Sequence, residues 1–164
     1  MKTMRIALAA LSLALTTAAT AQDLQNQLIG TWDFVAQVRA PDGKISFPFR
    51  ESPKGMLVFT PDGRFMQIHV ASDVPRIAAN NRLKGTPDEY AEIMRRSISV
   101  FGTYTVDDAK RTVTYHIVSS SFPNWQGESQ TRTIDKLTAD EFINTNPNVA
   151  GGRGSASNFY KRAK

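Results

Sequence analysis

The sequence predicts an all-β protein, a closed up-and-down antiparallel barrel of about eight strands with one inserted α-helix. Three observations support this fold class. Eight short runs with β-type composition lie between residues 28 and 162, with Gly, Pro, Asp and Asn between them. Several of the connections have the length and residue types of hairpin turns, and closing such a meander removes exposed strand edges. Only residues 86–97 have the spacing of a helix.

The predicted strands are joined by turns whose residue types suit chain reversal. Pro-Asp-Gly occurs at residues 41–43 and again at 61–63, and it combines a preset φ at Pro with a Gly that accepts positive φ. The second of these turns predicts a hairpin between the runs on either side of it. The predicted strands are residues 28–39, 55–60, 64–71, 100–106, 112–118, 128–135, 141–145 and 155–162.

The segment 86–97 is predicted to form one amphipathic helix between the third and fourth strands. Thr86 can cap it, Pro87 suits its first position, and Glu89 completes a capping box. Tyr90, Ile93 and Met94 recur at helical spacing. With the polar stretch before it, this helix could lie across the open end of the barrel, or it could pack on the outer wall or plug one end.

Residues 1–21 have the features of a secretory signal peptide. Lys2 and Arg5 precede an apolar run that is too short for the roughly 20 residues of a membrane span, and small residues end at Ala21. We therefore expect an exported protein, periplasmic or extracellular, without a membrane span. The remaining residues, 22–164, match a single domain with one core.

Charge and cysteine content exclude several classes of function. Without Lys2 and Arg5 the basic residues fall from 20 to 18 against 15 acidic ones, so the net charge falls from +5 to +3. The basic residues are scattered without an aromatic-interleaved stripe, so no nucleic-acid partner is expected. The chain has no cysteine, which excludes disulfides, thiol catalysis and cysteine metal sites. No feature of the sequence indicates an oligomeric state.

Strand alternation predicts which side chains face the barrel interior. In the first strand Trp32, Phe34, Ala36 and Val38 share the inward face, opposite Asp33, Gln37 and Arg39. In the second strand Leu57 and Phe59 point inward, and across the tight turn Phe65, Gln67 and His69 continue that face. Gly102, Tyr104 and Val106 are expected inside the fourth strand. The fifth strand leaves two alternatives open, Val113-Tyr115-Ile117 or Thr114-His116-Val118.

Four motifs occur in order along the chain: Gly30-Thr31-Trp32, Phe59 to Phe65, Phe101 to Val106, and Ser121 to Gly127 with Arg132. With these motifs the chain resembles the bacterial lipocalin-like domain family, and the resemblance extends over about residues 26–162. Most members of that family are known as small barrels without an assigned activity. The resemblance implies that Trp32 lies under the barrel floor and that an arginine of the last strand stacks over it, for which Arg162 is the candidate and Lys161 its outward neighbour.

Two features bear on a ligand. Arg132 shares a face with Gln130 and Ile134, and a buried arginine is costly unless it is paired. It therefore either meets an anionic ligand group, joins a buried network with Tyr104 and Gln130, or points outward without a role. The aromatic loop with Phe122 and Trp125 either plugs the barrel mouth, which we favour, or lines an entrance.

We expect a non-catalytic barrel that binds one small, largely apolar or amphipathic molecule in its lumen. The alternatives are a protein-interaction module with a filled core, or an isomerase- or cyclase-type enzyme using Tyr104, His116 and Arg132. Two histidines without a spaced carboxylate motif do not predict a metal site, and no cofactor or catalytic residue is assigned. The candidate ligand-binding residues are Phe34, Phe59, Gln67, His69, Tyr104, His116, Trp125 and Arg132.

Overall fold

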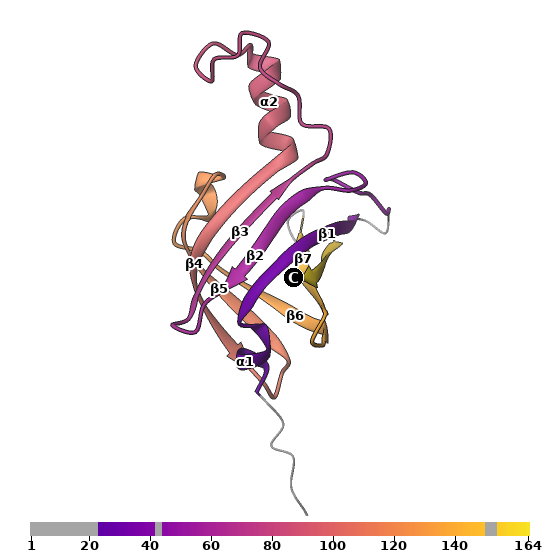
Figure 1. Cartoon of the computed structure of the whole chain (residues 1–164), viewed down its shortest axis with the longest axis vertical. Coiled ribbons are helices and arrows are strands. Elements are labelled where there is room, and N and C mark those ends of the chain that lie inside the picture. The colour runs from indigo at the N-terminus through magenta and orange to yellow at the C-terminus, as the bar shows by residue number, and fades with distance from the viewer. Residues whose placement is uncertain (1–22, 42–43, 150–153) are drawn as a thin grey trace, which may run out of the picture.

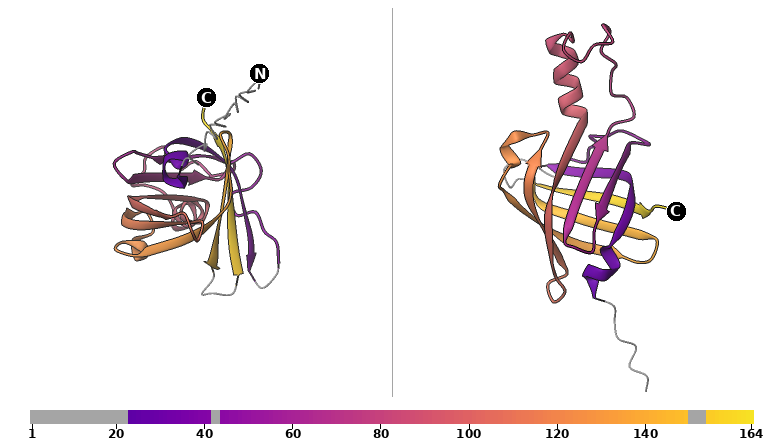
Figure 2. Two further views of the ribbon diagram at one scale, coloured as in Figure 1. Left: turned by 90° about the horizontal axis from the view of Figure 1, so that it is seen from below. Right: turned by 60° about the vertical axis from the view of Figure 1, so that its left-hand side comes forward.

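The computed structural model describes residues 23–41, 44–149 and 154–164, which form a closed eight-stranded antiparallel barrel (Figures 1 and 2). Each strand pairs with the next along the chain, and β8 pairs with β1 to complete the barrel, so the predicted fold class is confirmed. The predicted signal peptide and the turn residues 42–43 lie outside the described residues. The strands are β1 (Gly30–Pro41), β2 (Lys54–Phe59), β3 (Arg64–Val70), β4 (Ser97–Asp107), β5 (Thr112–Ser120), β6 (Ser129–Leu137), β7 (Glu141–Val149) and β8 (Gly154–Arg162).

The lower end of the barrel is closed by a short helix, α1 (Leu24–Leu28), which the sequence analysis did not predict (Figure 1). The predicted first strand included Leu28, whereas Leu28 ends α1 and the strand begins at Gly30. Leu24 and Leu28 are buried against the barrel core. The backbone N–H of Leu24 donates to Asp108 Oδ1 at 2.8 Å, which ties the helix to the β4–β5 turn.

The Trp32 and Arg162 pair expected from the family resemblance is present at this closed end. Trp32 is fully buried, and the Arg162 guanidinium carbon lies 4.0 Å from the centre of its ring. Arg162 also donates to the backbone oxygens of Gln27, Ile29 and Ala139 at 2.7, 3.0 and 2.6 Å. Gly30 has φ +125°, and a Cβ there would lie 2.8 Å from Arg162 Nη1, so the glycine makes room for this arginine.

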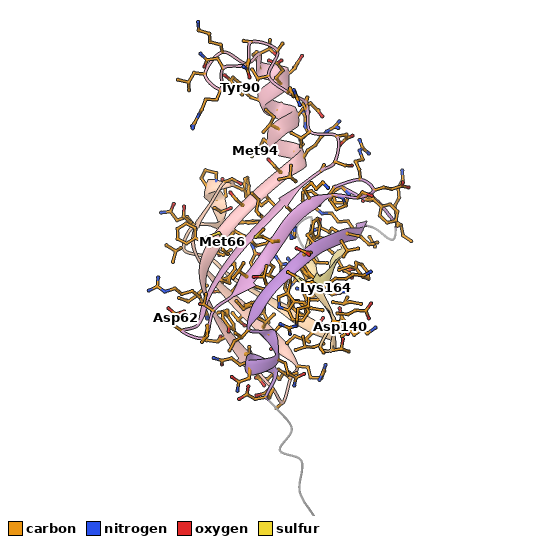
Figure 3. All side chains as sticks on the ribbon, viewed as in Figure 1. Asp62, Met66, Tyr90, Met94, Asp140 and Lys164 are labelled. Atoms are coloured by element: carbon orange, nitrogen blue, oxygen red, sulfur yellow. The ribbon has the colours of Figure 1, made fainter. Side chains whose placement is uncertain are left out.

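Helix α2 (Pro87–Arg96) has the predicted cap but an unexpected position. Thr86 and Glu89 form the capping box, with Thr86 N–H donating to Glu89 Oε2 at 2.7 Å. None of its residues is buried, and the helix extends away from the barrel instead of covering its mouth or wall (Figure 1). Tyr90 and Met94 accordingly lie on α2 beyond the barrel body (Figure 3). The predicted placement of this helix was therefore wrong.

The inward faces of β2 to β4 follow the predictions, and the structure decides between the two alternatives for β5. Phe59 and Phe65 face each other across the tight turn, and Gln67 and His69 continue that buried face. Tyr104 is buried in β4. In β5 the buried alternation is Val113, Tyr115 and Ile117, so His116 lies on the outer face.

The first strand departs from simple alternation because it contains a β-bulge at Val35. The register with β8 shifts between Phe34 and Ala36, and Val35 is 41% exposed. After the shift, Gln37 and Arg39 lie opposite Asn158 and Ala156, whose side chains are buried, whereas Ala36 and Val38 lie opposite outward-facing residues. The prediction that Ala36 and Val38 point inward was therefore wrong, because one extra residue exchanges the two faces of the strand.

Pairing between β6 and β7 covers only part of the two strands. The register runs from Leu137 opposite Phe142 to Thr133 opposite Thr145 and ends there. Residues 129–132 of β6 and 146–149 of β7 are therefore not paired with each other. This opening in the wall positions the candidate site described below. Among the described residues, no helix is long and apolar enough to cross a membrane.

Candidate functional site

A cleft of about 780 Å³ lies where β6 and β7 separate. Its size is within the range of small-molecule sites in proteins. Trp125, in the 3₁₀ turn η1 (Pro123–Trp125), forms part of its wall, so this aromatic loop lines an opening instead of only plugging the barrel mouth. Phe122 supports Trp125 edge-to-face, with ring centres 5.6 Å apart. The cleft is lined by Arg39, Thr112, Trp125, Ser129, Gln130, Thr131, Thr133 and residues 146–149.

Hydrogen bonds connect this cleft to the barrel interior through a row of polar side chains that we call the polar arc. It begins at the cleft with Arg39, whose Nε donates to Gln37 Oε1 at 2.8 Å. Gln37 Nε2 donates to Asn158 Oδ1 at 2.7 Å, and Asn158 Nδ2 donates to Asn144 Oδ1 at 3.0 Å. Asn144 and Asn158 are essentially fully buried. The arc therefore crosses β1, β8 and β7 along the inner wall.

Arg132 on β6 is the charged end of the polar arc. It is buried, with 7% of its surface exposed, so the prediction's outward alternative is wrong. Its Nη1 lies 3.5 Å from Asn144 Oδ1 and its Nη2 lies 3.3 Å from Gln130 Oε1, both long for hydrogen bonds from a charged group. Its guanidinium stands 4.9 Å from the centre of the Tyr115 ring. The expected network with Gln130 is present, with Tyr115 in the place suggested for Tyr104.

His69 on β3 lies among aromatic side chains of the barrel interior. Its ring stacks on Phe34 with centres 3.5 Å apart, and Phe49 from the loop after β1 covers it edge-on. The His69 Nε2 atom shares a 3.0 Å hydrogen bond with the Tyr160 hydroxyl. Phe49 is 4% exposed although it lies in a loop, so it fills this part of the barrel interior.

Burial and the charge of Arg132 set the protonation of the interior. Burial lowers the pKa of His69 well below its usual value, and the positive charge of Arg132 lowers that pKa further. Burial raises the pKa of Tyr115 to about 12 and also raises that of Tyr160. Arg39 keeps an exposed side chain at the cleft, but partial desolvation and repulsion from Arg132 lower its pKa. At neutral pH the interior therefore contains neutral His69 and tyrosines beside cationic arginine.

Four buried polar atoms of the described residues have no hydrogen-bond partner: His69 Nδ1, the Tyr115 hydroxyl, Arg132 Nε and Asn144 Nδ2. Arg132 Nε and Asn144 Nδ2 can only donate, and the tyrosine hydroxyl can also donate. The role of His69 Nδ1 depends on its tautomer. Unpaired buried polar groups are rare and costly, so this cluster of donors marks a chemically distinct part of the interior.

The candidate residues do not all meet at one place. Phe34, His69, Gln67 and Arg132 line the interior, and Trp125 lies at the cleft. Phe59 belongs to the aromatic packing of the lower half, beside Phe142 and Tyr104. The Tyr104 hydroxyl donates to Thr60 O at 3.2 Å.

His116 lies outside the barrel, bonded to Thr105 Oγ1 and Ser129 Oγ at 3.2 and 2.9 Å. The wall of the barrel therefore separates it from Arg132, and the acid, base and anion stabiliser of the enzyme alternative are not brought together. Within the described residues, no group of three or more His, Asp or Glu side chains could hold a metal ion.

Several residues of the site were missed at the sequence level. Asn144 and Asn158 could have been found, because each lies two positions from a buried aromatic residue, Phe142 and Tyr160, on its strand. Gln37 and Arg39 could not, because only the bulge at Val35 brings them inward. Phe49 lies in a loop, where alternation gives no signal.

The model of the lipocalin-like domain family matches residues 29–157 of the chain. The chain belongs to this family. A stretch of 66 residues is 33% identical to the 4'-hydroxy-3'-methoxypropiophenone carrier protein ppsC of Aspergillus oryzae, and it covers 37% of this chain and 60% of that protein. The chain thus spans about three fifths of the length of this relative.

Two solved barrel structures are similar to this chain at low sequence identity. A lipocalin-like protein from Bacteroides uniformis gives a TM-score of 0.46 at 14% identity, covering 84% of this chain and 99% of its own. A redesigned β-barrel gives a TM-score of 0.42 at 17% identity, covering 85% of this chain and 95% of its own.

Proposed function

We propose that this protein is an exported, non-catalytic carrier that binds one small molecule through the cleft between β6 and β7. The observation that carries the proposal is the continuity of that cleft with the polar arc, since Arg39 belongs to both and Gln130 of the cleft wall accepts from Arg132 of the arc. An eight-stranded barrel has room for one small ligand where side chains do not fill it. The lower half is filled by aromatic residues, so the ligand occupies the side of the barrel where β6 and β7 separate.

Two further facts support a carrier. Members of the lipocalin-like domain family share this barrel, and the relative from Aspergillus oryzae is named a carrier of a small aromatic ketone. The separation of His116 from Arg132 also removes the catalytic arrangement that the sequence suggested. These facts support transport or storage of a small molecule over its conversion.

Native mass spectrometry of the protein purified from its own host tests the carrier. We expect a bound molecule of a few hundred daltons that is released on denaturation. The ligand should be lost when the cleft is obstructed, for which Thr131→Trp is suitable because Thr131 lines the cleft from the outer face of β6. Thr105→Trp is the control, since Thr105 is also on an outer face but does not line the cleft. A ligand retained equally by both variants would contradict binding in the cleft.

Export is tested separately from binding. Expression of the full chain in its own host, followed by fractionation and N-terminal mass spectrometry, should give a protein outside the cytoplasm that begins at Gln22. A chain that keeps residues 1–21 and stays in the cytoplasm would contradict the proposed export.

A further inference from the structure

The buried guanidinium of Arg132 has no negative partner among the described residues. None of the ion pairs found there includes it, and its Nε has no acceptor at all. Its two hydrogen bonds, of 3.3 and 3.5 Å, go to neutral amide oxygens. Burial of a charge is expensive unless that charge is paired and fully hydrogen-bonded. Stability alone therefore does not explain an arginine at this position.

The surroundings of Arg132 are also free of carboxylates. The buried polar residues of the described chain are Gln67, His69, Arg132, Asn144 and Asn158, and the cleft wall contains Arg39 but no aspartate or glutamate. Asp135, the nearest acidic residue along β6, is exposed and binds Thr133 and Thr145 through their hydroxyls. The site thus holds two arginines and only neutral partners.

Further unpaired donors accompany the charge. Asn144, fully buried, directs its Oδ1 to Arg132 and Asn158, which leaves its Nδ2 without an acceptor among the described residues. The Tyr115 hydroxyl is unpaired as well, and its ring lies under the guanidinium. These buried donors lie behind Gln130, which lines the cleft and accepts from Arg132 Nη2 at 3.3 Å. Arginine, amide and hydroxyl donors match the acceptor atoms of an oxyanion.

The remaining cleft wall suits an uncharged body. Trp125, Pro147 and Val149 contribute apolar surface there, and Ser129 and Thr131 contribute uncharged hydroxyls. One buried cation balances one negative charge, and a carboxylate can accept two parallel bonds from a guanidinium. These features favour an organic monoanion over a phosphate dianion or a neutral molecule.

We infer that the cleft binds a small amphipathic carboxylate, whose anionic end displaces Gln130 from Arg132 and reaches Arg132 and Asn144 behind it, and whose apolar body lies beside Trp125. This inference rests on the proposed carrier function and specifies the chemistry of its ligand. Binding would give the guanidinium the partner that the protein itself does not provide. Arg39, at the cleft surface, would attract the same anion during entry.

Matched probe pairs test this chemistry. Decanoate is compared with decanol, and 4-phenylbutyrate with 4-phenylbutanol, by calorimetry and by fluorescence at pH 7 with protein freed of host ligand. In each pair the body is similar and the end group differs. Because charge-assisted hydrogen bonds are roughly twice as strong as neutral ones, we expect the carboxylate to bind about tenfold more tightly than the alcohol, a difference of about 1.4 kcal/mol.

Two substitutions test the role of Arg132. Arg132→Gln removes the charge and should reduce the preference for carboxylate to less than about threefold. Asn144→Asp instead places a carboxylate of the protein 3.5 Å from Arg132 Nη1, so the guanidinium is already paired and the preference should also disappear. This variant keeps the shape of the side chain, so it remains informative if Arg132→Gln folds poorly. Arg64→Gln, an exposed arginine paired with Asp62, is the control and should keep the preference.

The outcomes separate this inference from the carrier function. Equal binding of acid and alcohol by the unaltered protein, or a carboxylate preference that persists in both Arg132→Gln and Asn144→Asp, overturns the carboxylate assignment and leaves the carrier standing. If neither member of either pair binds and no molecule co-purifies from the host, the carrier function itself is overturned.

Discussion

Arg162 stabilises the closed end of the barrel through one ring and three backbone oxygens. Its guanidinium covers the buried Trp32 ring and donates to carbonyls of α1, of the residue after it and of the β6–β7 turn. Three chain segments distant in sequence are therefore joined at a single side chain. Gly30 completes the arrangement, since a side chain there would collide with this guanidinium.

Truncation of Arg162 should destabilise the whole protein. We expect Arg162→Ala to lower the free energy of unfolding by about 2 to 4 kcal/mol, from the lost stacking and the three carbonyls left without their charged donor. Arg162→Lys should restore little of this stability, because an ammonium group lacks the planar set of N–H donors of a guanidinium. Urea unfolding measures both. Lys161→Ala, the outward neighbour, should change stability by less than about 0.5 kcal/mol, and an equal loss there would contradict this explanation.

His69 should make stability depend on pH in a specific direction. The folded protein keeps it neutral, whereas in the unfolded chain it takes up a proton below its ordinary pKa of 6.5. The unfolded state therefore binds more protons, and stability that is complete above pH 6.5 should decrease as the pH falls, by up to about 1.4 kcal/mol per pH unit.

Urea unfolding at pH 7, 6 and 5 measures this dependence. The variant His69→Gln can still bond to Tyr160 and should lose most of the change between pH 7 and 5. His116→Gln removes the histidine of the outer face and should retain the change in stability between pH 7 and 5. If the pH dependence is lost in His116→Gln and kept in His69→Gln, proton uptake on unfolding is not due to His69.

For single residues, the sequence predicted the direction of a side chain correctly where a tight turn fixes the register of one strand relative to the next. Gln67 and His69 were placed inside because Phe65 continues the face of Phe59 across the Pro61 to Gly63 turn, and the pairing of β2 with β3 confirms it. The sequence placed Arg132 on the same face as Ile134, but it did not decide whether that face points inward. A single charged residue is compatible with exposure to solvent and with a ligand site. Its environment depends on Asn144, a residue of another strand.

Among the elements, the bulge in β1 has the largest effect on the site. A regular strand would have directed Ala36 and Val38 inward, as the hydrophobic pattern predicts. The extra residue at Val35 brings Gln37 and Arg39 inward instead, and these start the polar arc. Bulges leave little trace in a sequence because both faces after Val35 are compatible with a strand. The part of the polar arc that β1 contributes, Gln37 and Arg39, was therefore not predictable from periodicity.

Helix α2 is the opposite case. The sequence contains strong local signals for where the helix begins and ends, but no signal for where it packs. The capping box formed as predicted, yet none of the helix residues is buried. Its ends are determined by local hydrogen bonds, whereas its direction depends on how β4 begins at Ser97. The apolar spacing of Tyr90 and Met94 indicated a covered face that the structure does not provide.

Loss of the cap should therefore affect α2 without affecting the barrel. We expect Thr86→Ala to weaken the helix by about 1 kcal/mol and to speed amide exchange in Pro87–Arg96 about fivefold. The midpoint of global thermal unfolding should stay within about 1 °C of the original, since α2 buries no side chain in the core. Thr86→Ser keeps the cap and should change neither. A large drop in global stability would mean that α2 packs against the barrel in solution.

The molecule as a whole combines a filled half and a polar half in one barrel. Aromatic residues around Trp32, Phe59 and Phe142 pack the end closed by α1. The polar arc and the cleft occupy the side where β6 and β7 separate, so the closed sheet has one local opening. The alternatives of a filled core and a ligand-binding lumen thus apply to different parts of the same interior.

Amide exchange can locate this opening and its ligand in one experiment. In β6 and β7, pairing ends at Thr133 opposite Thr145, so amides of residues 129–132 and 146–149 that face the gap have no partner across it. They should exchange much faster than those of residues 133–137 and 142–145, because exchange there needs only local opening. Binding of a carboxylate in the cleft should slow the gap-facing amides and leave α2 unchanged. Protection centred on the outer face of β2 to β5, around Met66 (labelled in Figure 3), would instead place the ligand outside the barrel, where Met66 and Phe101 are exposed apolar side chains.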